Sequence, residues 1–526
     1  MPDFSQFQHV SAAPTNPHAT AGPKAFDVAD LYASGPVADV ARAPDGALPL
    51  DEKLRQAYFW IVNRAIISPH YDLEYFDGPH QSYTFGDSKT VVNLPSGQSY
   101  SSFVLLPLLN FAVRRRCLLV GGPGRGKTAT SILMGVLAGY KLTEVRRAMQ
   151  HGQPQMTISD LLGNPLPADL VAARSMSEIH IAWRQWLGMR VKIIDEYNRI
   201  PTRTQSALLT VLADNYAELL DQVYECPPAA WYLTANDDAG GGTYPVIEAL
   251  RDRIDIVVKT LHFNNRFLGE LLTRVEAGID PAEIVPPQII FTPSEIDQMN
   301  KDALAVEFPP ELLRRLEFFS SQFEFFEPAA QQLEYMTKDT AKLAGADQHL
   351  LGAQETGKDR VKDLGAQTKN GLSVRALMTV LVFAKALAYF RGNRVVALED
   401  LRQIIPFVLH DKLQPDPDAP FFEDGNSVLR IDRVSWLRKL FDLACAEYDR
   451  LNLDKDDPVA GLEAEFSQGL EGLKEKDVRA RLVRIERLLA EWSKGRKLYG
   501  NLFDDVLKLK YLHQRYTNYL HWLTSQ

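Results

Sequence analysis

The sequence predicts an α/β fold followed by helical domains. Between residues 117 and 260, short apolar runs such as CLLV, VKIID and AAWYLTAN alternate with segments of helical periodicity. This alternation is typical of a parallel sheet with helices on both faces. From about residue 264 the strand signals fade and the pattern becomes helical. We therefore expect one α/β domain and a helical remainder.

Length and composition place the chain among globular proteins with more than one domain. Its 526 residues are 45% hydrophobic and 24% charged, which is ordinary for a folded protein. A chain of this length is expected to form about two to four domains. The net charge is -9, whereas a chain that wraps nucleic acid usually carries a basic excess. The only tight basic cluster is Arg114–Arg116, and we interpret it as the solvated start of a strand rather than a DNA contact.

The sequence lacks signals for a membrane or for secretion. No apolar run reaches the roughly 18 residues needed to span a bilayer, and the first residues lack the basic and apolar regions of a secretory signal. Cys117, Cys226 and Cys445 are scattered and odd in number, which is typical of reduced thiols. These observations predict a cytoplasmic protein without a membrane partner.

Shifts in composition and periodicity divide the chain into expected domains. The first residues are rich in Ala, Pro and small polar residues, which predicts a disordered arm. QSYTFGDSKTVVNL then reads as a hairpin with a Gly-Asp turn. The expected boundaries are 1–48 for the arm, 49–97 for a helix and hairpin extension, 98–263 for the α/β domain, 264–413 for a helical domain with an inserted loop around 338–371, and 414–526 for a helical C-terminal domain.

Apolar residues near the C-terminus repeat at 4-3-4-3 spacing over two stretches, 478–492 and 502–523. This spacing predicts two helices that pack as an antiparallel hairpin. His513 lies on the expected seam, and we interpret it as a packed histidine rather than a ligand. The hairpin is either a self-contained tail or a docking arm for a partner.

The segment GGPGRGKT, residues 121–128, fits the pattern G-x-x-x-x-G-K-[ST] and follows the apolar run CLLV. In such a loop the glycines let backbone N–H groups turn toward phosphate oxygens, and the next helix presents its positive end to the same anion. Lys127 is expected to reach the β- and γ-phosphates, and Thr128 to ligate Mg²⁺. Since no His/Cys spacing of a metal site occurs, any metal should arrive with the nucleotide. The expected nucleotide-binding residues are Gly122, Pro123, Gly124, Arg125, Gly126, Lys127, Thr128 and Ala129. The apolar segment 98–113 leads into this loop, where it would either touch the base or pack in the core.

Two further strands end in polar side chains. VKIID ends in Asp195, which Glu196 follows, and AAWYLTAN ends in Asn236. Asp195 at a strand end can hold Mg²⁺ through water, and Glu196 can orient the attacking water. Because neighbouring residues of a regular strand point to opposite faces, the turn must place Glu196. Asn236 would sense the γ-phosphate, or it caps its strand.

Three tracts of the sequence resemble the MoxR family of AAA+ ATPases. They are IIDEYNRIPTRTQSALLTVLAD, GGTYPVIEALRDRID and GLSVRALMTVLVFAKALAYFRGNRVVALEDL, and the resemblance spans roughly 98–413. It implies an AAA+ P-loop parallel sheet followed by an all-α lid, with ATP and Mg²⁺ as cofactors. It also implies a ring, usually a hexamer, in which each ATP lies at a subunit interface. Two departures are Tyr197, where the family usually has Ile, and Val374, where it usually has Pro.

The resemblance also assigns roles to two arginines. Arg253 in ALRDRID would be the arginine finger that reaches the γ-phosphate of the neighbouring subunit, with Arg251 as the alternative. Arg375 in SVRAL would be the lid arginine, sensor 2. Such roles need fixed cations, because charge develops on the phosphoryl oxygens. The alternative is that the former arginine pairs with Asp252 or Asp255 and that the latter faces solvent at the start of its helix.

An insertion in the second helix, facing the central pore, is a further implication of the resemblance and would place the chain in the helix-2-insert clade. It should lie within 156–180, and a short hairpin is expected at 215–226. Both segments would contact a client protein or merely connect their neighbours. The insertion carries one basic residue, Arg174, against several acidic residues, which argues against a pore that grips DNA.

We therefore expect a MoxR-type AAA+ ATPase that hydrolyses ATP in a homohexameric ring to remodel, activate or mature a protein client. Such ATPases commonly work with a partner that bears a von Willebrand factor A domain. The D-x-S-x-S motif of that domain does not occur in this sequence, so the partner would be a separate protein. The alternatives are a nucleic-acid-directed or defence AAA+ motor, a chelatase-type motor subunit, and a scaffold whose ATP site governs assembly only.

Overall fold

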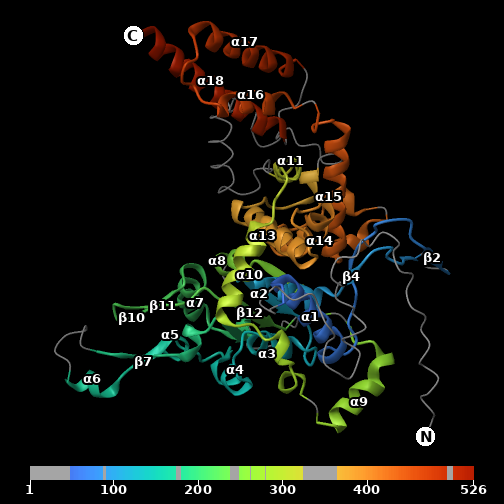
Figure 1. The fold of residues 1–526 in the computed structure, drawn as a ribbon, viewed down its shortest axis with the longest axis vertical. Helices are drawn as coiled ribbons and strands as arrows, with labels where there is room; N and C mark the ends of the chain where they lie inside the picture. Colours follow the sequence, from blue (N-terminus) through green and yellow to red (C-terminus); the bar gives the residue numbers. More distant parts are fainter. Residues whose placement is uncertain are drawn as a thin grey trace.

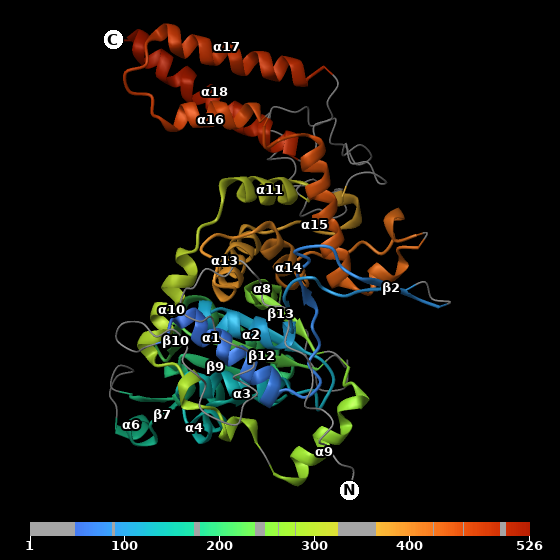
Figure 2. The ribbon, with the colours of Figure 1, turned by 45° about the vertical axis from the view of Figure 1, so that its right-hand side comes forward.

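The structure, a computed structural model, consists of a sheet-centred body that carries a helical extension at its C-terminal end (Figures 1 and 2). It describes residues 48–526 except for 87–89, 173–178, 237–247, 261, 279, 324–363, 424, 456, 495–500 and 526. The arm expected at 1–48 lies outside the described residues except for its last residue. Most of the loop expected around 338–371, and Arg174 of the insertion, also lie outside them.

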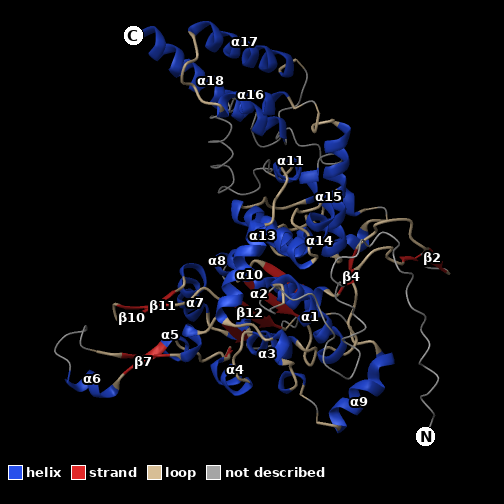
Figure 3. Cartoon of the chain, viewed as in Figure 1, coloured by secondary structure: helices blue, strands red, loops and turns tan. Residues whose placement is uncertain are grey.

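A five-stranded parallel sheet forms the centre of the body, in the order β13-β5-β12-β9-β6. The apolar runs singled out in the sequence supply its three inner strands, and the prediction of a parallel α/β sheet is confirmed. Figure 3 shows these strands enclosed by helices, which is why they read as continuous apolar runs without alternation. The strands are β5 Arg116–Val120, β6 Gln150–His151, β9 Val191–Asp195, β12 Ala230–Ala235 and β13 Ile256–Lys259.

Alternate side chains of each strand enter two separate cores. Leu119 of β5 packs into the larger core with α2, α3 and the lid helices, whereas its neighbour Leu118 packs into a second core with α7. The larger core therefore joins one face of the sheet to the lid. The helices that flank the sheet are α2 Ser102–Val113, α3 Lys127–Leu137, α4 Leu142–Ala148, α7 Thr202–Asp214 and α8 Glu248–Arg253.

The N-terminal extension packs against α2 and α13 through the buried face of α1 Leu50–Trp60, which continues into the π-helical turn η3 Ile61–Ala65. The predicted hairpin is confirmed, because β2 Ser82–Phe85 pairs antiparallel with β3 Thr90–Asn93. A second antiparallel pair, β1 Leu73–Glu74 and β4 Ser99–Tyr100, lies at the base of this hairpin.

The cluster Arg114–Arg116 lies at the start of β5 as expected, but two of its arginines pair with carboxylates of the body and are not solvated. Arg114 donates a hydrogen bond of 2.7 Å to Asp297 of α10. Arg116 pairs with the buried Asp255 at 3.3 Å. A long arginine side chain can cover apolar surface and still bring its guanidinium to a carboxylate. These two arginines therefore serve the packing of the body.

The chain leaves the sheet through α9 Leu268–Glu276 and then enters the lid. The lid helices α13 and α14 pack against each other, α13 also against α2, and α14 against α15. Their buried residues belong to the larger core, which explains the long apolar stretches of this region. The remaining helices up to the C-terminal bundle are α10 Pro293–Ala305, α11 Pro310–Ser321, α13 Val374–Phe390, α14 Leu398–Leu409 and α15 Arg433–Arg450.

Two hairpins project from one side of the body (Figure 1). β10 Tyr216–Leu219 pairs with β11 Gln222–Glu225, which confirms the hairpin expected at 215–226. The other hairpin arises within the expected insertion. It consists of α5 Ile158–Leu162, β7 Gly163–Pro165, α6 Pro167–Ala172 and β8 Ile181–Trp183, with β7 and β8 antiparallel.

The C-terminal helices form a bundle with a core of its own. α17 and α18 lie side by side (Figure 2) and run antiparallel, because Arg481 stacks over Tyr516 while Glu486 contacts His513. The predicted hairpin is confirmed, but His513 is not packed in its seam. Leu512 is buried instead, and His513 is partly exposed at 3.1 Å from Glu486. The helices are α16 Pro458–Ser467, α17 Glu475–Trp492 and α18 Asn501–Ser525.

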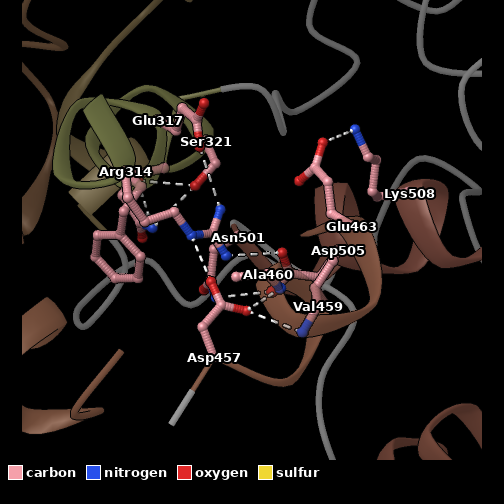
Figure 4. Close-up of polar contacts among 12 residues, drawn as sticks. Arg314, Glu317, Ser321, Asp457, Val459, Ala460, Glu463, Asn501, Asp505 and Lys508 are labelled. Atoms are coloured by element: carbon pink, nitrogen blue, oxygen red, sulfur yellow. Dashed lines mark hydrogen bonds and ion pairs between the residues drawn. The ribbon is translucent and has the colours of Figure 1, made fainter. Parts of the chain in front are cut away.

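Arg314 of α11 connects the lid to this bundle (Figure 4). Its guanidinium donates to Asp457 at 2.8 Å and to Asp505 at 3.1 Å. Asp457 precedes α16 and accepts from the backbone N–H groups of Val459 and Ala460. Burial raises the pKa of Asp505, although Arg314 lies beside it. A polar cluster thus lies at this junction between the lid and the bundle.

Lys192 lies inside the central sheet, although lysine is rarely buried. Its ammonium donates to the carbonyl oxygen of Met189 at 2.6 Å and lies 5.7 Å from the centre of the Trp231 ring. Burial lowers the pKa of Lys192 from 10.5 to about 8.

We predict that Lys192→Met raises the melting temperature at pH 7 and that this difference from the parent shrinks toward pH 10. Between pH 8 and 10.5 the unfolded chain binds more protons at Lys192 than the folded chain, so the folded state gains stability as the pH rises. The shift corresponds to at most about 3 kcal/mol at neutral pH. Melting curves at both pH values measure the effect, with the exposed Lys476→Met as control. A difference that does not change with pH would contradict the prediction.

Candidate nucleotide-binding site

The glycine-rich loop joins the carboxyl end of β5 to α3, which begins at Lys127. Gly126 has φ 78°, a left-handed conformation that glycine adopts without strain and that turns the loop into the helix. Gly121 has φ 155°, and a Cβ there would come within 1.7 Å of the Thr260 hydroxyl. Both glycines are therefore required by the path of the backbone. The first turn of α3 follows the loop, and backbone N–H groups at the start of a helix can bind an anion.

Lys127 is held over the loop by oxygens of the protein. Its ammonium donates to the carbonyls of Gly121 at 2.5 Å and Gly122 at 2.7 Å, and to the Asn236 side chain at 3.0 Å. All three acceptors are neutral, and a phosphate oxygen is a stronger, charged acceptor. The side chain is thus positioned to change partners when a triphosphate binds.

The two residues expected at the metal, Thr128 and Asp195, are in direct contact. The Thr128 hydroxyl donates to Asp195 at 2.9 Å. Thr234 of β12 donates to the same carboxylate oxygen at 2.5 Å. Hydroxyl and carboxylate oxygens are the donors that Mg²⁺ prefers. The chemistry of this pair therefore fits the ion that accompanies ATP.

Glu196 departs from the regular strand. Its φ of 52° is left-handed, so the turn after β9 redirects its side chain as the sequence predicts. Its backbone N–H donates to the Thr234 hydroxyl at 2.9 Å. Its carboxylate accepts from Asn236 at 3.0 Å and lies 3.3 Å from Arg199. Asn236 thereby connects Glu196 to Lys127, which brings together three of the residues expected in catalysis.

Thr234 and Arg199 were not singled out in the sequence. Thr234 is an ordinary strand residue by its type, although its place one residue before the strand end puts it beside Asp195. Arg199 belongs to DEYNR, the tract that resembles the family, and this was the available signal. Tyr197 of the same tract is buried in the second core, and burial raises the pKa of its phenol.

A cavity of about 310 Å³ lies beside the glycine-rich loop. One wall is the segment 65–70 that follows η3, and another is formed by residues after β13. Of the apolar segment 98–113, Ser101 and Phe103 reach this cavity, and most of its other residues are buried. At its mouth, His262 contacts Arg125 at 3.3 Å through its ring. The cavity has the position that a base would occupy when the phosphates lie on the loop, and the sequence did not point to 65–70.

The two expected arginines lie together in a different place. Arg253 and Arg375 line a cavity of about 350 Å³ with Arg115, Asp214 and Met378. Arg253 ends α8 just before β13, so it lies at the amino edge of the parallel sheet. The glycine-rich loop follows β5 at the opposite, carboxyl edge. The structure therefore does not bring these arginines to the nucleotide loop of the same chain.

The carboxylates near these arginines are paired. Asp252 pairs with Arg375 at 2.5 Å, and Asp255 pairs with Arg116. The side chain of Ser373 caps α13 by accepting from Ala376. Arg251, the alternative finger, lines another cavity with Asp411 and Lys412. Arg251 and Arg253 thus line different cavities, and experiment must decide which of them is the finger.

Comparison with known proteins found a family model, a curated relative and a solved structure. The family model described as the AAA lid domain matches residues 364–431. Chaperone MoxR1 of Mycobacterium tuberculosis is 25% identical over 258 residues, which are 48% of this chain and 59% of that protein. The crystal structure of a provisionally assigned ATPase from Cytophaga hutchinsonii is 18% identical and covers 64% of this chain and 89% of its own, with a TM-score of 0.44.

A parallel sheet with a phosphate loop, followed by an AAA lid domain, defines an AAA+ ATPase. Within this class the chain is similar to the MoxR family, through its match to Chaperone MoxR1. AAA+ ATPases as a class use ATP with Mg²⁺ and usually form oligomers. The chain spans 59% of the length of its MoxR1 relative. Among the described residues, no helix is long and apolar enough to cross a membrane.

We predict that Thr234→Val lowers kcat about tenfold while the Kd for ATP changes little. The Thr234 hydroxyl donates to Asp195 and accepts from the Glu196 backbone, so its loss frees both carboxylates from their positions. Steady-state hydrolysis and binding of a fluorescent ATP analogue measure the two quantities. Thr234→Ser keeps the hydroxyl and should retain most of the activity, whereas an equal loss in both variants would contradict the assigned role.

Proposed function

We propose that the chain hydrolyses ATP within a ring of identical copies and uses this cycle to remodel, activate or mature a protein client. The observation that carries the proposal is the separation of Arg253 and Arg375 from the nucleotide loop of their own chain. Between the two edges of the sheet lies β5, whose five residues span about 13 Å at roughly 3.3 Å per residue. A guanidinium at the amino edge serves a triphosphate only on another copy.

Each half of the active site has a defined task in this proposal. Lys127 and the N–H groups of the loop bind the phosphates, and Thr128 with Asp195 would hold Mg²⁺, which neutralises phosphate charge when bound. Glu196 orients the attacking water, and Asn236 senses the γ-phosphate through its contacts with Glu196 and Lys127. These side chains lie on three strand ends of one sheet. They are therefore held in place before the nucleotide arrives.

The other half of the site comes from the neighbouring copy. Arg253 acts as the finger that stabilises charge on the transferred phosphoryl group, and Arg375 approaches the same nucleotide from the lid. Because hydrolysis then requires two copies, ATP turnover and assembly are coupled. A homohexamer is the assembly that we propose.

The client and the partner follow from the family alone. The relative MoxR1 is described as a chaperone, which supports a protein client. We propose a separate protein with a von Willebrand factor A domain as the partner, and a cytoplasmic location. The β7–β8 and β10–β11 hairpins project from one side of the body (Figure 1), as segments that line a central pore would. This arrangement supports our proposal that the chain belongs to the helix-2-insert clade.

The proposal also includes the boundaries of the domains and a choice between this function and a nucleic-acid motor. Residues 98–263 form the nucleotide-binding domain, 264–413 the lid, and 414–526 a domain that selects the client. A nucleic-acid motor is disfavoured, because the insertion 156–180 carries one basic residue against several acidic ones. No described feature favours a chelatase subunit over a chaperone.

We predict that an inactive Arg253→Ala variant and an inactive Glu196→Gln variant recover ATP hydrolysis when they are mixed. Glu196→Gln supplies an intact finger, and Arg253→Ala supplies an intact nucleotide site to meet it. In random mixed rings, about a quarter of the sites combine both intact halves. Phosphate release from each variant and from the mixture measures the effect. An inactive mixture would show that Arg253 does not act across copies.

Asp252 is expected to hold Arg375 back when ATP is absent. The pair at 2.5 Å must open before Arg375 reaches a phosphate. We predict that Asp252→Asn lowers the ATP concentration for half-maximal hydrolysis by about two- to fivefold, the range of an exposed ion pair. The matched control is Asp214→Asn, which lines the cavity that also contains Arg375. Unchanged ATP dependence in Asp252→Asn, or an equal shift in the control, would contradict this role.

A further inference from the structure

Helix α9 presents an apolar face to solvent. Leu268, Leu272 and Val275 occur at positions i, i+4 and i+7, so they lie on one side of the helix. Their exposed fractions are 49%, 53% and 68%. No residue of α9, which is described over its whole length, is buried. Both views show α9 at the edge of the body, away from the lid helices (Figures 1 and 2).

The position of this face is fixed next to the nucleotide loop. Arg274 of α9 donates to the carbonyl oxygen of Arg64 at 2.7 Å, which ties the helix to η3. Arg274 also pairs with Glu270 one turn earlier. On its inner side, Leu271 lines the cavity beside the glycine-rich loop. α9 therefore borders the site at the carboxyl edge of the sheet.

A second exposed apolar pair lies at the opposite edge, beside the two arginines. Val374 and Met378 are one turn apart at the start of α13, with exposed fractions of 74% and 59%. Arg375 lies between them in the sequence, and Met378 lines the cavity that also contains Arg253. Val374 replaces the proline that is usual in the family. The first helical position of α13, where the family usually has a proline, therefore carries a branched apolar side chain that forms this exposed pair with Met378.

We infer that the apolar face of α9 is the docking surface for Val374 and Met378 of a second copy of this chain. The inference rests on the proposed ring, because one contact must bring Arg253 and Arg375 to the nucleotide loop of a neighbour. Val374 and Met378 border these arginines, and the apolar face of α9 borders the loop. The same contact therefore brings these two surfaces together. Two different surfaces of one chain then meet head to tail, which is the arrangement that closes into a ring.

Charge complementarity supports this pairing of surfaces. The cavity beside Met378 carries an excess of positive charge, since four arginines line it with two carboxylates: Arg115, Arg116, Arg253 and Arg375 against Asp214 and Asp255. The opposite edge carries Asp195 and Glu196 and would receive the negative charges of ATP. Opposite charges at the site fix the orientation of the two copies, while apolar residues beside them supply area that is removed from water. Exposed apolar residues that lie next to charged residues are typical of an interaction surface.

Crosslinking between two cysteine variants tests the contact. Leu272→Cys and Met378→Cys are made separately in the Glu196→Gln chain, in which Cys445, the one native cysteine that is not buried, is replaced by serine. The two proteins are mixed with ATP and Mg²⁺ and oxidised gently. We expect a disulfide-linked dimer in the mixture and none from either variant alone or without ATP. The control pair replaces Leu272→Cys with Val483→Cys, which is equally exposed on α17 and should give no product.

A second measurement separates this inference from the proposed ring. Native mass spectrometry of the Glu196→Gln parent with ATP reports whether a ring forms at all. If it forms and the cysteine pair does not crosslink, the α9 contact is overturned while the ring stands. If the parent remains a monomer with ATP bound, the ring and the contact are both overturned.

Charge placed on the face gives an independent readout. Leu272→Glu is expected to raise the chain concentration at half-maximal assembly by about tenfold, since a buried contact residue at an interface has an effect of this size. Its melting temperature should match that of the parent, because Leu272 is exposed in the single chain. Val483→Glu is the matched control. Equal assembly of Leu272→Glu and the parent would overturn the inference.

Discussion

The parallel register of β5, β9 and β12 is the constraint on which the candidate site depends. β12 lies between the other two strands, and its Tyr232 is paired with Cys117 on one side and with Ile193 on the other. The carboxyl ends of all three strands therefore lie at one edge. The phosphate loop, the acidic pair and Asn236 follow these ends. Lys127 and Asn236 thus meet at 3.0 Å although 109 positions separate them in the chain.

The same register divides the chemistry between two edges. In a parallel α/β sheet, ligands bind at the carboxyl ends of the strands. The segments that lead into the strands lie at the amino ends. Arg253 stands on such an entering segment, and the start of α13 is packed beside it. The chain therefore has its nucleotide loop at one edge and Arg253 and Arg375 at the other. In the ring that we propose, two copies complete one site, and this links assembly to hydrolysis.

Polar contacts of unassigned residues hold the assigned ones in place. Thr234 fixes Asp195 and the backbone of Glu196 at once. Arg116 pairs with Asp255 where the sheet meets the lid, and the Asp255 side chain also accepts from Thr379 of α13. These contacts join the lid helix α13 to the residue that precedes β13. They are invisible to motif recognition, because their residue types are common on any surface.

The sequence by itself determined the elements that depend on local patterns. Apolar runs of strand length, the glycine-rich loop and the 4-3-4-3 spacing at the C-terminus are local signals, and the strands, the loop and the α17–α18 hairpin follow from them. The turn that redirects Glu196 was also foreseeable, because a regular strand cannot point two adjacent carboxylates to one side. The three family tracts added the expectation of the lid, which the AAA lid match supports, and the expected roles of the arginines.

Only the tertiary structure decided which side chains share a site and which face remains open. His513 was expected in the seam, but Leu512 is the buried residue, and α18 packs against α16 as well as α17. The arginines 114 and 116 were expected in solvent, but their partners Asp297 and Asp255 lie far away in the chain. Likewise, an amphipathic helix such as α9 predicts a buried face without naming what buries it. Contacts between residues so far apart in the sequence depend on how the whole body packs, and a local sequence pattern does not predict them.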